Sequence, residues 1–438
     1  MIFNIDKNLW FDNEKINIII GEKNLKRYKE NYDKYPQVQI KKDDNWYPSI
    51  TYLSSTCCNL RCKYCFAHEG TYDIKSDFNT FKCEEYIRTF ELVYNKYKHV
   101  ASVTFFGGEP MINYREIEKF CKYLFENYTE EERPVLGINT NSTIYNLEIK
   151  NMIKCYGINF GTSLDGNKEY NDRFRVGNNI ESVYEKVKST LLDLSDVPVQ
   201  KIVQMTVSKI HIENYSKGDC VRWMQEIGEM GVKCTEMIPV TTEDELFKID
   251  LTDENIFKRY IDFCNDIFEY TIKELEKDDG KIGNCPKIVV GLLCRIMRRE
   301  YQKDCTAGKC FTFVPQGKIY PCHTFAMDEK YGEDTREGFS FEKLDDNEFY
   351  ASVKYASREK IQKCTDCIGR NLCAFYCRGL SNSTYGDINH IFNERCVMLE
   401  QLIIACIKYF SSDRFVMNRK NVINNIIKYH EIATLYKG

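Results

Sequence analysis

Short apolar runs alternate with amphipathic stretches between residues 49 and 240. Runs of this length, rich in β-branched residues, are typical of buried parallel strands, whereas apolar positions three or four residues apart are typical of helices. The predicted strands are Ser49–Leu53, Ser102–Phe106, Val135–Thr140, Ile158–Leu164, Val199–Val207 and Lys233–Pro239. The predicted helices between them are Glu84–Tyr97, Tyr114–Tyr128, Asn146–Cys155, Ile180–Leu194 and Tyr215–Met230. Such alternation predicts an α/β fold with a parallel sheet wrapped by helices.

The two ends of the chain carry weaker patterns. A β-hairpin (Phe3–Asp6 with Ile16–Ile20) and a charged helix near Asn24–Tyr32 are predicted first. Later helices are predicted at Asp253–Lys277, Lys287–Arg299, Val397–Phe410 and Val422–Tyr429. We therefore expect an N-terminal hairpin and helix (1–48), a barrel core (49–245), bridging helices (246–300), a cysteine-rich domain (301–400) and C-terminal helices (401–438).

Composition narrows the class of protein. Hydrophobic residues make up 43% and charged residues 29%, which is ordinary for a globular protein. The net charge of −4 gives no sign of the basic surface that nucleic-acid binding requires. No basic segment followed by an apolar one opens the chain, and no run approaches the roughly 18 apolar residues of a membrane span. Twenty-one cysteines without an export signal predict a cytoplasmic protein that uses thiols for metal binding.

Three of these cysteines directly follow the first predicted strand. Cys58, Cys62 and Cys65 have the spacing C-x3-C-x2-C. Three thiolates can each bind one iron of a 4Fe–4S cluster, and the fourth iron then keeps an open position, as a catalytic metal centre needs. A zinc knuckle or a disulfide cluster is the alternative. The C-terminal ends of parallel strands are where α/β barrels carry their active sites, so the triplet is a candidate catalytic centre.

The triplet resembles the defining motif of radical S-adenosylmethionine (SAM) enzymes, whose third cysteine usually follows an aromatic residue, here Tyr64. The resemblance implies a partial (β/α)6 TIM-like barrel with bound SAM. The second strand ends in Gly107, Gly108, Glu109 and Pro110, which resemble the family motif that binds the SAM amino group. Glycines let the backbone approach a ligand closely, and a carboxylate can accept from an ammonium group.

Later strand ends add candidate SAM contacts. Asn141 follows the third strand, and Ser163 lies at the end of the fourth, in a Ser-Leu-Asp-Gly stretch. In relatives with this stretch, the serine and the arginine of a downstream H-D-x-x-R contact the ribose or carboxylate of SAM. Asn171 replaces that histidine here, so the resemblance implies roles only for Ser163 and Arg175. The alternatives are a helix cap and a solvated charge.

The C-terminal third holds a second cysteine constellation. Its pattern is C-x4-C, then G-x4-C, then C-x2-C-x5-C-x3-C and a last cysteine, which resembles the SPASM domain of peptide- and protein-modifying radical SAM enzymes. The resemblance implies two auxiliary 4Fe–4S clusters, three clusters in all. The first would be held by Cys305, Cys310, Cys322 and Cys377, and the second by Cys364, Cys367, Cys373 and Cys396. Two structural zinc sites are the alternative. Most of the other ten cysteines are expected to be buried apolar residues.

The resemblance also implies a reaction. Reductive cleavage of SAM, fed by a flavodoxin or ferredoxin, would yield a 5′-deoxyadenosyl radical that abstracts hydrogen from a peptide. The stretch Tyr320–Phe325 resembles maturases of ribosomally made Cys-rich peptides, including thioether-forming ones of clostridia. We therefore expect a cytoplasmic oxidoreductase that crosslinks a Cys-rich precursor peptide, with neither nucleic acid nor membrane as partner. Alternatives are sulfatase-type formylglycine formation, carbon–carbon crosslinking, or a non-enzymatic electron carrier. His323 replaces the aspartate of sulfatase-maturing relatives, and no catalytic residue can be named.

Overall fold

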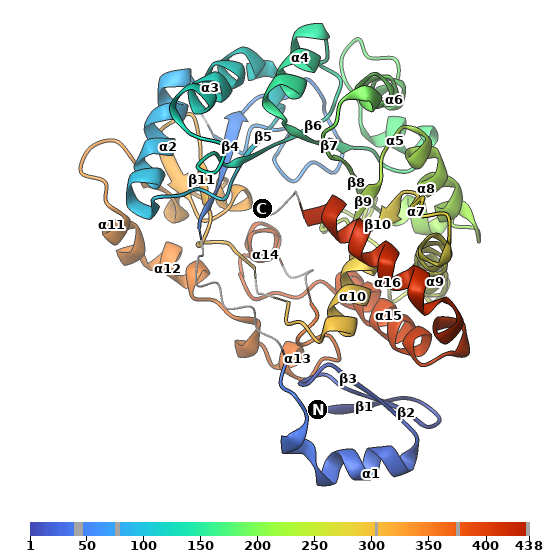
Figure 1. Cartoon of the computed structure of the whole chain (residues 1–438). Helices are drawn as coiled ribbons and strands as arrows, with labels where there is room; N and C mark the ends of the chain where they lie inside the picture. The colour runs from blue at the N-terminus through green and yellow to red at the C-terminus, as the bar shows by residue number, and fades with distance from the viewer. Residues whose placement is uncertain (39–46, 75–78, 303–304, 374–376, 435–438) are drawn as a thin grey trace.

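The computed structural model describes residues 1–38, 47–74, 79–302, 305–373 and 377–434 (Figure 1). Its central sheet has the strand order β10-β9-β8-β7-β6-β5-β4-β11-β12-β13. The six predicted strands lie side by side and parallel within it, each within two residues of its predicted bounds. They are β4 (Ser49–Ser55), β5 (Ser102–Gly107), β6 (Val135–Thr140), β7 (Asn159–Ser163), β8 (Lys201–Val207) and β9 (Cys234–Pro239).

Helices cover the outside of this arc of strands (Figure 1). The predicted ones form as α2 (Cys83–Tyr97), α3 (Tyr114–Asn127), α4 (Leu147–Tyr156), α6 (Val183–Asp193) and α8 (Asp219–Glu229). Two short helices were not predicted, α5 (Lys168–Phe174) and α7 (Lys209–Glu213). The two edges of the sheet, β10 and β13, do not pair with each other, so the barrel is open and the predicted partial α/β barrel is confirmed.

Aromatic packing fixes the first barrel strand. Tyr52 of β4 is fully buried, and its ring centroid lies 4.8 Å from that of Tyr86 and 5.8 Å from that of Phe120. Its hydroxyl donates to the Tyr86 carbonyl oxygen (3.1 Å), so the polar end of the ring is satisfied. Aromatic side chains bury large areas, and this cluster therefore anchors the strand whose end carries the cysteine triplet.

The cysteine-rich region extends the same sheet. β11 (Phe311–Phe313) pairs parallel to β4 and antiparallel to β12 (Lys318–Tyr320), which in turn pairs with β13 (Glu333–Asp334). Hydrogen bonding to β4 places this region directly beside the strand that leads into the triplet. At the other edge, β10 (Cys285–Pro286) pairs with β9.

The N-terminal segment forms a separate three-stranded antiparallel sheet. Its strands are β1 (Ile2–Asp6), β2 (Leu9–Asp12) and β3 (Asn17–Ile20), followed by α1 (Glu22–Glu30). The predicted pairing of the first and last of these strands was wrong, because β2 lies between them. A tight turn at Asn8, whose φ is 61°, allows β2 to follow β1 directly.

The remaining helices close the structure around the cysteine-rich region. They are α9 (Glu254–Glu276), α10 (Lys287–Arg298), α11 (Phe341–Asp346), α12 (Glu348–Lys354), α13 (Gln362–Thr365), α14 (Arg378–Tyr385), α15 (Asn393–Phe410) and α16 (Asp413–Thr434). The helix predictions in this part are confirmed, although α15 and α16 both extend beyond their predicted bounds. Within the described ranges, no helix is both long and apolar enough to cross a membrane.

Candidate active site

The cysteine triplet lies in the loop that leaves β4 at the C-terminal edge of the sheet. Cys58, Cys62 and Cys65 are half-buried free thiols. Burial raises the pKa of the Cys58 thiol to about 12, and the negative charges of Glu109, Cys62 and Cys65 add to the rise, so the three sulfurs interact with one another. Across the described ranges, no three His, Cys, Asp or Glu side chains are arranged to hold a metal ion. In a 4Fe–4S cluster each thiolate binds its own iron, and three interacting free thiols on one loop match that donor set.

Glycines hold the triplet loop against the loop that leaves β5. A Cβ added to Gly108 would lie 2.3 Å from the Cys57 carbonyl oxygen and 2.7 Å from that of Gly70. Gly107 has a φ of 131°, and a Cβ there would lie 2.3 Å from the Ser55 carbonyl oxygen. The amide of Gly108 donates to that Ser55 oxygen (2.7 Å). These glycines are therefore needed for contact between two loops, whereas the sequence argument explained them by contact with a ligand.

Glu109 is fully buried at the end of β5. Its carboxylate accepts from the Met111 amide (2.9 Å), the Thr140 hydroxyl (2.6 Å) and the Asn141 amide (2.7 Å). Burial raises the pKa of Glu109 to about 7, although the three donors lower it in part. Pro110 opens the short 3-10 helix Pro110–Asn113 that follows. A carboxylate has about four acceptor positions, so one is left for a further donor such as an ammonium group.

Asn141 joins the end of β6 to the triplet. Its side-chain amide lies 3.7 Å from the Cys58 Sγ and donates to the Asn59 side-chain oxygen (2.9 Å). Asn59 in turn donates to the Thr143 hydroxyl (2.7 Å). The structure therefore brings Asn141, Glu109 and the triplet together, as the candidate site requires.

Arg175 and Tyr64 meet at a carboxylate that sequence reasoning missed. The side chain of Asp165 is fully buried and pairs with the Arg175 guanidinium, accepting from Nε (2.8 Å) and Nη2 (3.1 Å). The Tyr64 hydroxyl donates to the same carboxylate. Arg175 is itself buried, so a solvated charge is excluded. The Ser-Leu-Asp-Gly stretch contained the only signal for Asp165.

Ser163 belongs to a row of polar side chains across neighbouring strands. It is half-buried at the end of β7 and lies in register with Gln204 of β8, which is in register with Glu236 of β9. The Gln204 amide donates to the Glu236 carboxylate (3.4 Å), and the Lys287 ammonium lies 3.8 Å from the same carboxylate. These side chains extend the polar edge away from the triplet, and Gln204, Glu236 and Lys287 were not predicted.

The first auxiliary cysteine set comes together from three segments of the cysteine-rich region. Cys305 interacts electrostatically with Cys322 and Cys377, and Cys310 interacts with Cys322. Burial opposes ionisation of the Cys322 thiol, but the charge and hydrogen bond of His323 lower its pKa to about 6. The other three thiols of this set thus each interact with Cys322.

A second apolar core lies between the triplet and this first auxiliary set. It contains Leu53 and Tyr72, and Cys65, Cys305 and Cys322 pack against it. Burial raises the pKa of Tyr72 strongly, and the charges of Cys65, Cys322 and Cys58 raise it further. Tyr72 therefore lies within range of both cysteine sets, which places the candidate catalytic centre beside the first auxiliary site.

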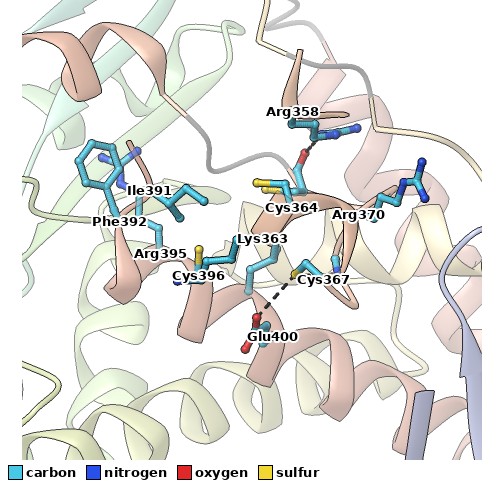
Figure 2. Close-up of a pocket in the computed structure, with 13 residues that line it drawn as sticks. Arg358, Lys363, Cys364, Cys367, Arg370, Ile391, Phe392, Arg395, Cys396 and Glu400 are labelled. Carbon is cyan, nitrogen blue, oxygen red and sulfur yellow. Dashed lines mark hydrogen bonds between the residues drawn. The ribbon is translucent and has the colours of Figure 1, made fainter. Parts of the chain in front are cut away.

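The second auxiliary set lines a single cavity (Figure 2). Four cysteines from two separate stretches of the chain face this space together with basic side chains and one carboxylate. The Cys367 Sγ lies 3.6 Å from Glu400. Convergence of four thiols on one cavity fits a fully ligated 4Fe–4S cluster. The cysteines are Cys364, Cys367, Cys373 and Cys396, and the charged groups are Arg358, Lys363, Arg370, Arg395 and Glu400.

A family model described as the radical SAM superfamily matches residues 52–197, which include the triplet and strands β5 to β7. The chain carries a radical SAM domain. It is therefore an enzyme, and an electron carrier without catalytic activity is excluded.

Relatives of this radical SAM enzyme cover most of its length. A cysteine-type anaerobic sulfatase-maturating enzyme of Clostridium novyi is 26% identical over 358 residues, which span 78% of this chain and 91% of that protein. The radical SAM cyclopropyl synthase TigE of Paramaledivibacter caminithermalis is 24% identical over 434 residues, spanning 90% and 83% of the two chains. Both similarities extend well beyond the radical SAM domain.

Solved structures share the fold. Native anSMEcpe with bound AdoMet superposes with a TM-score of 0.66 at 18% identity and covers 87% of this chain and 99% of that one. SuiB of Streptococcus suis bound to S-adenosylmethionine gives a TM-score of 0.53 at 15% identity and covers 85% and 82%. The fold of this radical SAM enzyme is thus that of anSMEcpe and SuiB, including most of the C-terminal region.

Proposed function

We propose that this radical SAM enzyme forms thioether crosslinks in a ribosomally made, Cys-rich precursor peptide. The observations that carry the proposal are the convergence of Cys364, Cys367, Cys373 and Cys396 on one cavity and the position of the first auxiliary cysteine set beside the catalytic centre. Joining a thiol to a carbon removes two hydrogens from the peptide. One can leave as a hydrogen atom, and the other must leave as a proton and an electron. A site that accepts an electron beside the catalytic centre is therefore part of this chemistry.

Relatives support a peptide substrate. The Clostridium novyi relative is named a sulfatase-maturating enzyme, so it acts on a protein. Two structural neighbours were solved with peptides, anSMEcpe with the Kp18Cys peptide and SuiB with its precursor peptide SuiA. These proteins share the fold of this chain, and we infer that it too acts on a peptide chain.

The proposed cofactors follow from the cysteine sets. Cys58, Cys62 and Cys65 would hold the open-site cluster, and the eight C-terminal cysteines would hold two auxiliary clusters. Together with SAM, the open-site cluster would supply the radical chemistry that removes hydrogen from the substrate. Glu109 would accept from the SAM ammonium group through its remaining acceptor position. We also propose a flavodoxin or ferredoxin as electron donor, and further SAM contacts for Tyr64, Gly107, Gly108, Pro110, Asn141, Ser163 and Arg175.

Formylglycine formation is the second candidate, and the match to the Clostridium novyi enzyme favours it. His323 argues against it, because sulfatase-maturing enzymes carry an aspartate at this position. The His323 ring lies 3.5 Å from the Cys322 Sγ and packs against Phe106 of β5, with ring centroids 4.8 Å apart. The carboxylate of those enzymes is thus replaced here by an imidazole beside a cysteine of the first auxiliary set.

The test is an anaerobic reaction of the enzyme with SAM, dithionite and a Cys-rich precursor peptide. Thioether formation lowers the peptide mass by two hydrogen atoms per bond, and the crosslinked thiols then resist alkylation. Formylglycine formation converts a cysteine into an aldehyde, which a hydrazide reagent captures. A product whose thiols all remain open to alkylation, or one captured by hydrazide, contradicts the thioether proposal.

A further inference from the structure

Two polar side chains in the middle of β8 and β9 point into the barrel. Gln204 of β8 and Glu236 of β9 lie in register and are half-buried. Met205, the neighbour of Gln204, is buried on the face that the helices cover, since a Cβ added to Gly166 would touch both Met205 and Trp223 of α8. Successive side chains of a strand point to opposite faces of a sheet, so Gln204 and its register partner point inward.

The inner face of the barrel is filled below this pair and is open to solvent at the pair itself. Two residues earlier in each strand, Ile202 and Cys234 lie in register and are buried. The fully buried Tyr429 of α16 donates to the carbonyl oxygen of Cys285, which is the register partner of Cys234 on β10 (2.7 Å). The side chain of Glu236, by contrast, is 34% exposed although β9 has a strand on either side. Gln204 and Glu236 therefore form the floor of the accessible part of the inner face.

The Glu236 carboxylate is held only loosely at this floor. It accepts from the Gln204 amide at 3.4 Å, and the Lys287 ammonium lies 3.8 Å from it. Among the described residues it makes no other hydrogen bond or ion pair. A half-exposed ion pair contributes little to stability. A carboxylate has about four acceptor positions and an ammonium group three donors, so most of them stay open to a ligand.

These three side chains lead from the proposed SAM site to the open edge of the barrel. Gln204 is the register partner of Ser163 at the end of β7. Glu236 lies three residues before the end of β9, which is roughly 10 Å along the strand. Lys287 directly follows β10, the edge strand. A chain that enters the barrel beside SAM and runs toward this edge would pass over all three.

We propose that Glu236 and Lys287 bind one main-chain amide group of the substrate peptide, with Gln204 as the positioning residue of the carboxylate. The inference rests on the proposed peptide substrate. A peptide unit has a donor N–H and an acceptor C=O, and a carboxylate beside an ammonium group offers the matching acceptor and donor. The two charges cancel, so the pair does not select a charged side chain. Main-chain hydrogen bonds give affinity without requiring one side-chain sequence.

The experiment measures binding of a fluorescein-labelled Cys-rich precursor peptide to full-length enzyme that has been reconstituted anaerobically with iron and sulfide. Fluorescence anisotropy without SAM gives the Kd of the peptide, calorimetry gives the Kd of SAM, and urea titration gives stability. The variants Glu236→Gln and Lys287→Met each remove one charge and keep a similar side-chain length. Glu85→Gln is the matched control, because Glu85 is 37% exposed and pairs with Arg88 on α2, outside the barrel. A series of peptides, each with one N-methylated amide, removes the main-chain N–H groups one at a time.

For Glu236→Gln we expect the Kd of the peptide to rise about tenfold, because a charged hydrogen-bond acceptor is lost. Lys287→Met should raise it about threefold, and Glu85→Gln should leave it unchanged. The Kd of SAM and the urea midpoint should stay the same in all three variants. At one position of the peptide, N-methylation should weaken binding to the wild type about tenfold and should not weaken binding to Glu236→Gln further, since the two changes remove the same hydrogen bond.

The inference is overturned if N-methylation and Glu236→Gln act independently at every position of the peptide. It is also overturned if the Kd of SAM rises as much as that of the peptide, because the pair would then belong to the SAM site. Failure of the proposed function shows separately, since the anisotropy measurement needs no chemistry. In that case the wild type binds the labelled peptide, but the peptide mass does not fall after reaction with SAM and dithionite.

Discussion

Binding of SAM should depend on pH through Glu109. Burial raises the pKa of this carboxyl to about 7. Only the ionised form attracts the SAM ammonium group, so the apparent Kd equals the intrinsic Kd divided by the ionised fraction. That fraction is about one tenth at pH 6 and about three quarters at pH 7.5, so affinity should rise about eightfold between these values. An α-amino group, whose pKa is about 7.7–8.0, has lost part of its proton at pH 7.5, which lowers the observed rise to about five- to sixfold.

The effect of rising pH on folding stability has the opposite sign to its effect on SAM binding. Without SAM, the folded state keeps the Glu109 proton at pH values between about 4.5 and 7, where the unfolded chain has lost it. The folded state therefore binds more protons in this window, and this group makes unfolding easier as the pH rises through it. Saturating SAM should remove this trend, because its ammonium group favours the carboxylate.

Glu109→Gln isolates the charge. Glutamine cannot supply the charged acceptor, which is worth about 1.5–3 kcal/mol or roughly ten- to a hundredfold in Kd. The glutamine side chain also places an N–H group opposite one of the three donors that the wild-type carboxylate binds. Thr140→Val is the matched control, because it removes one donor to Glu109 and keeps the charge. We expect a weak, pH-independent Kd in Glu109→Gln, and in Thr140→Val a pH midpoint moved upward. Calorimetry at fixed salt measures both, and a wild-type Kd that is constant from pH 6 to 7.5 refutes the reasoning.

Three further changes test the architecture. Gly108→Ala forces the loops after β4 and β5 apart. It should lower the unfolding free energy by about 2–4 kcal/mol and remove most of the iron whose electron paramagnetic resonance signal responds to SAM. Gly157→Ala, with no atom within 4 Å of the added Cβ, should cost only about 1 kcal/mol in urea titrations. Tyr72→Ala opens the second apolar core and should cost about 3–5 kcal/mol, whereas Tyr355→Ala, at a side chain 63% exposed, should stay within about 0.5 kcal/mol. Wild-type protein should bind about twelve iron atoms, and the variant with alanine in place of four cavity cysteines should bind about eight. The contradicting result is that replacement of these four cysteines removes zinc instead of iron. Those four are Cys364, Cys367, Cys373 and Cys396.

The barrel could be predicted because its signals are local. Each of the six strands is an apolar run long enough to stand out, and β6 has the bounds Val135–Thr140 that its pattern predicts. Strands of two to four residues, such as β2, β10 and β13, carry too few positions for a pattern. Their pairing depends on segments far away in the sequence, and so the N-terminal pairing was predicted incorrectly.

The candidate site was predictable where spacing alone defines chemistry. Cysteine spacing identified eleven thiols, and the structure brings the second auxiliary set to one cavity. Roles that depend on a distant partner were not visible. Gly70 matters because it touches Gly108, and Arg175 is held by Asp165. Neither contact can be predicted from the sequence of one of the two segments alone.

The most direct test of the proposed function is the ratio of 5′-deoxyadenosine to crosslinks formed. In one anaerobic reaction with SAM, reductant and the Cys-rich peptide, 5′-deoxyadenosine and crosslinked peptide are both quantified by liquid chromatography and mass spectrometry. If each crosslink begins with one hydrogen abstraction, about one 5′-deoxyadenosine forms per bond, and neither product forms when Cys58, Cys62 and Cys65 are replaced by alanine. A peptide that is crosslinked without 5′-deoxyadenosine, or crosslinked equally by the triple variant, contradicts the central claim.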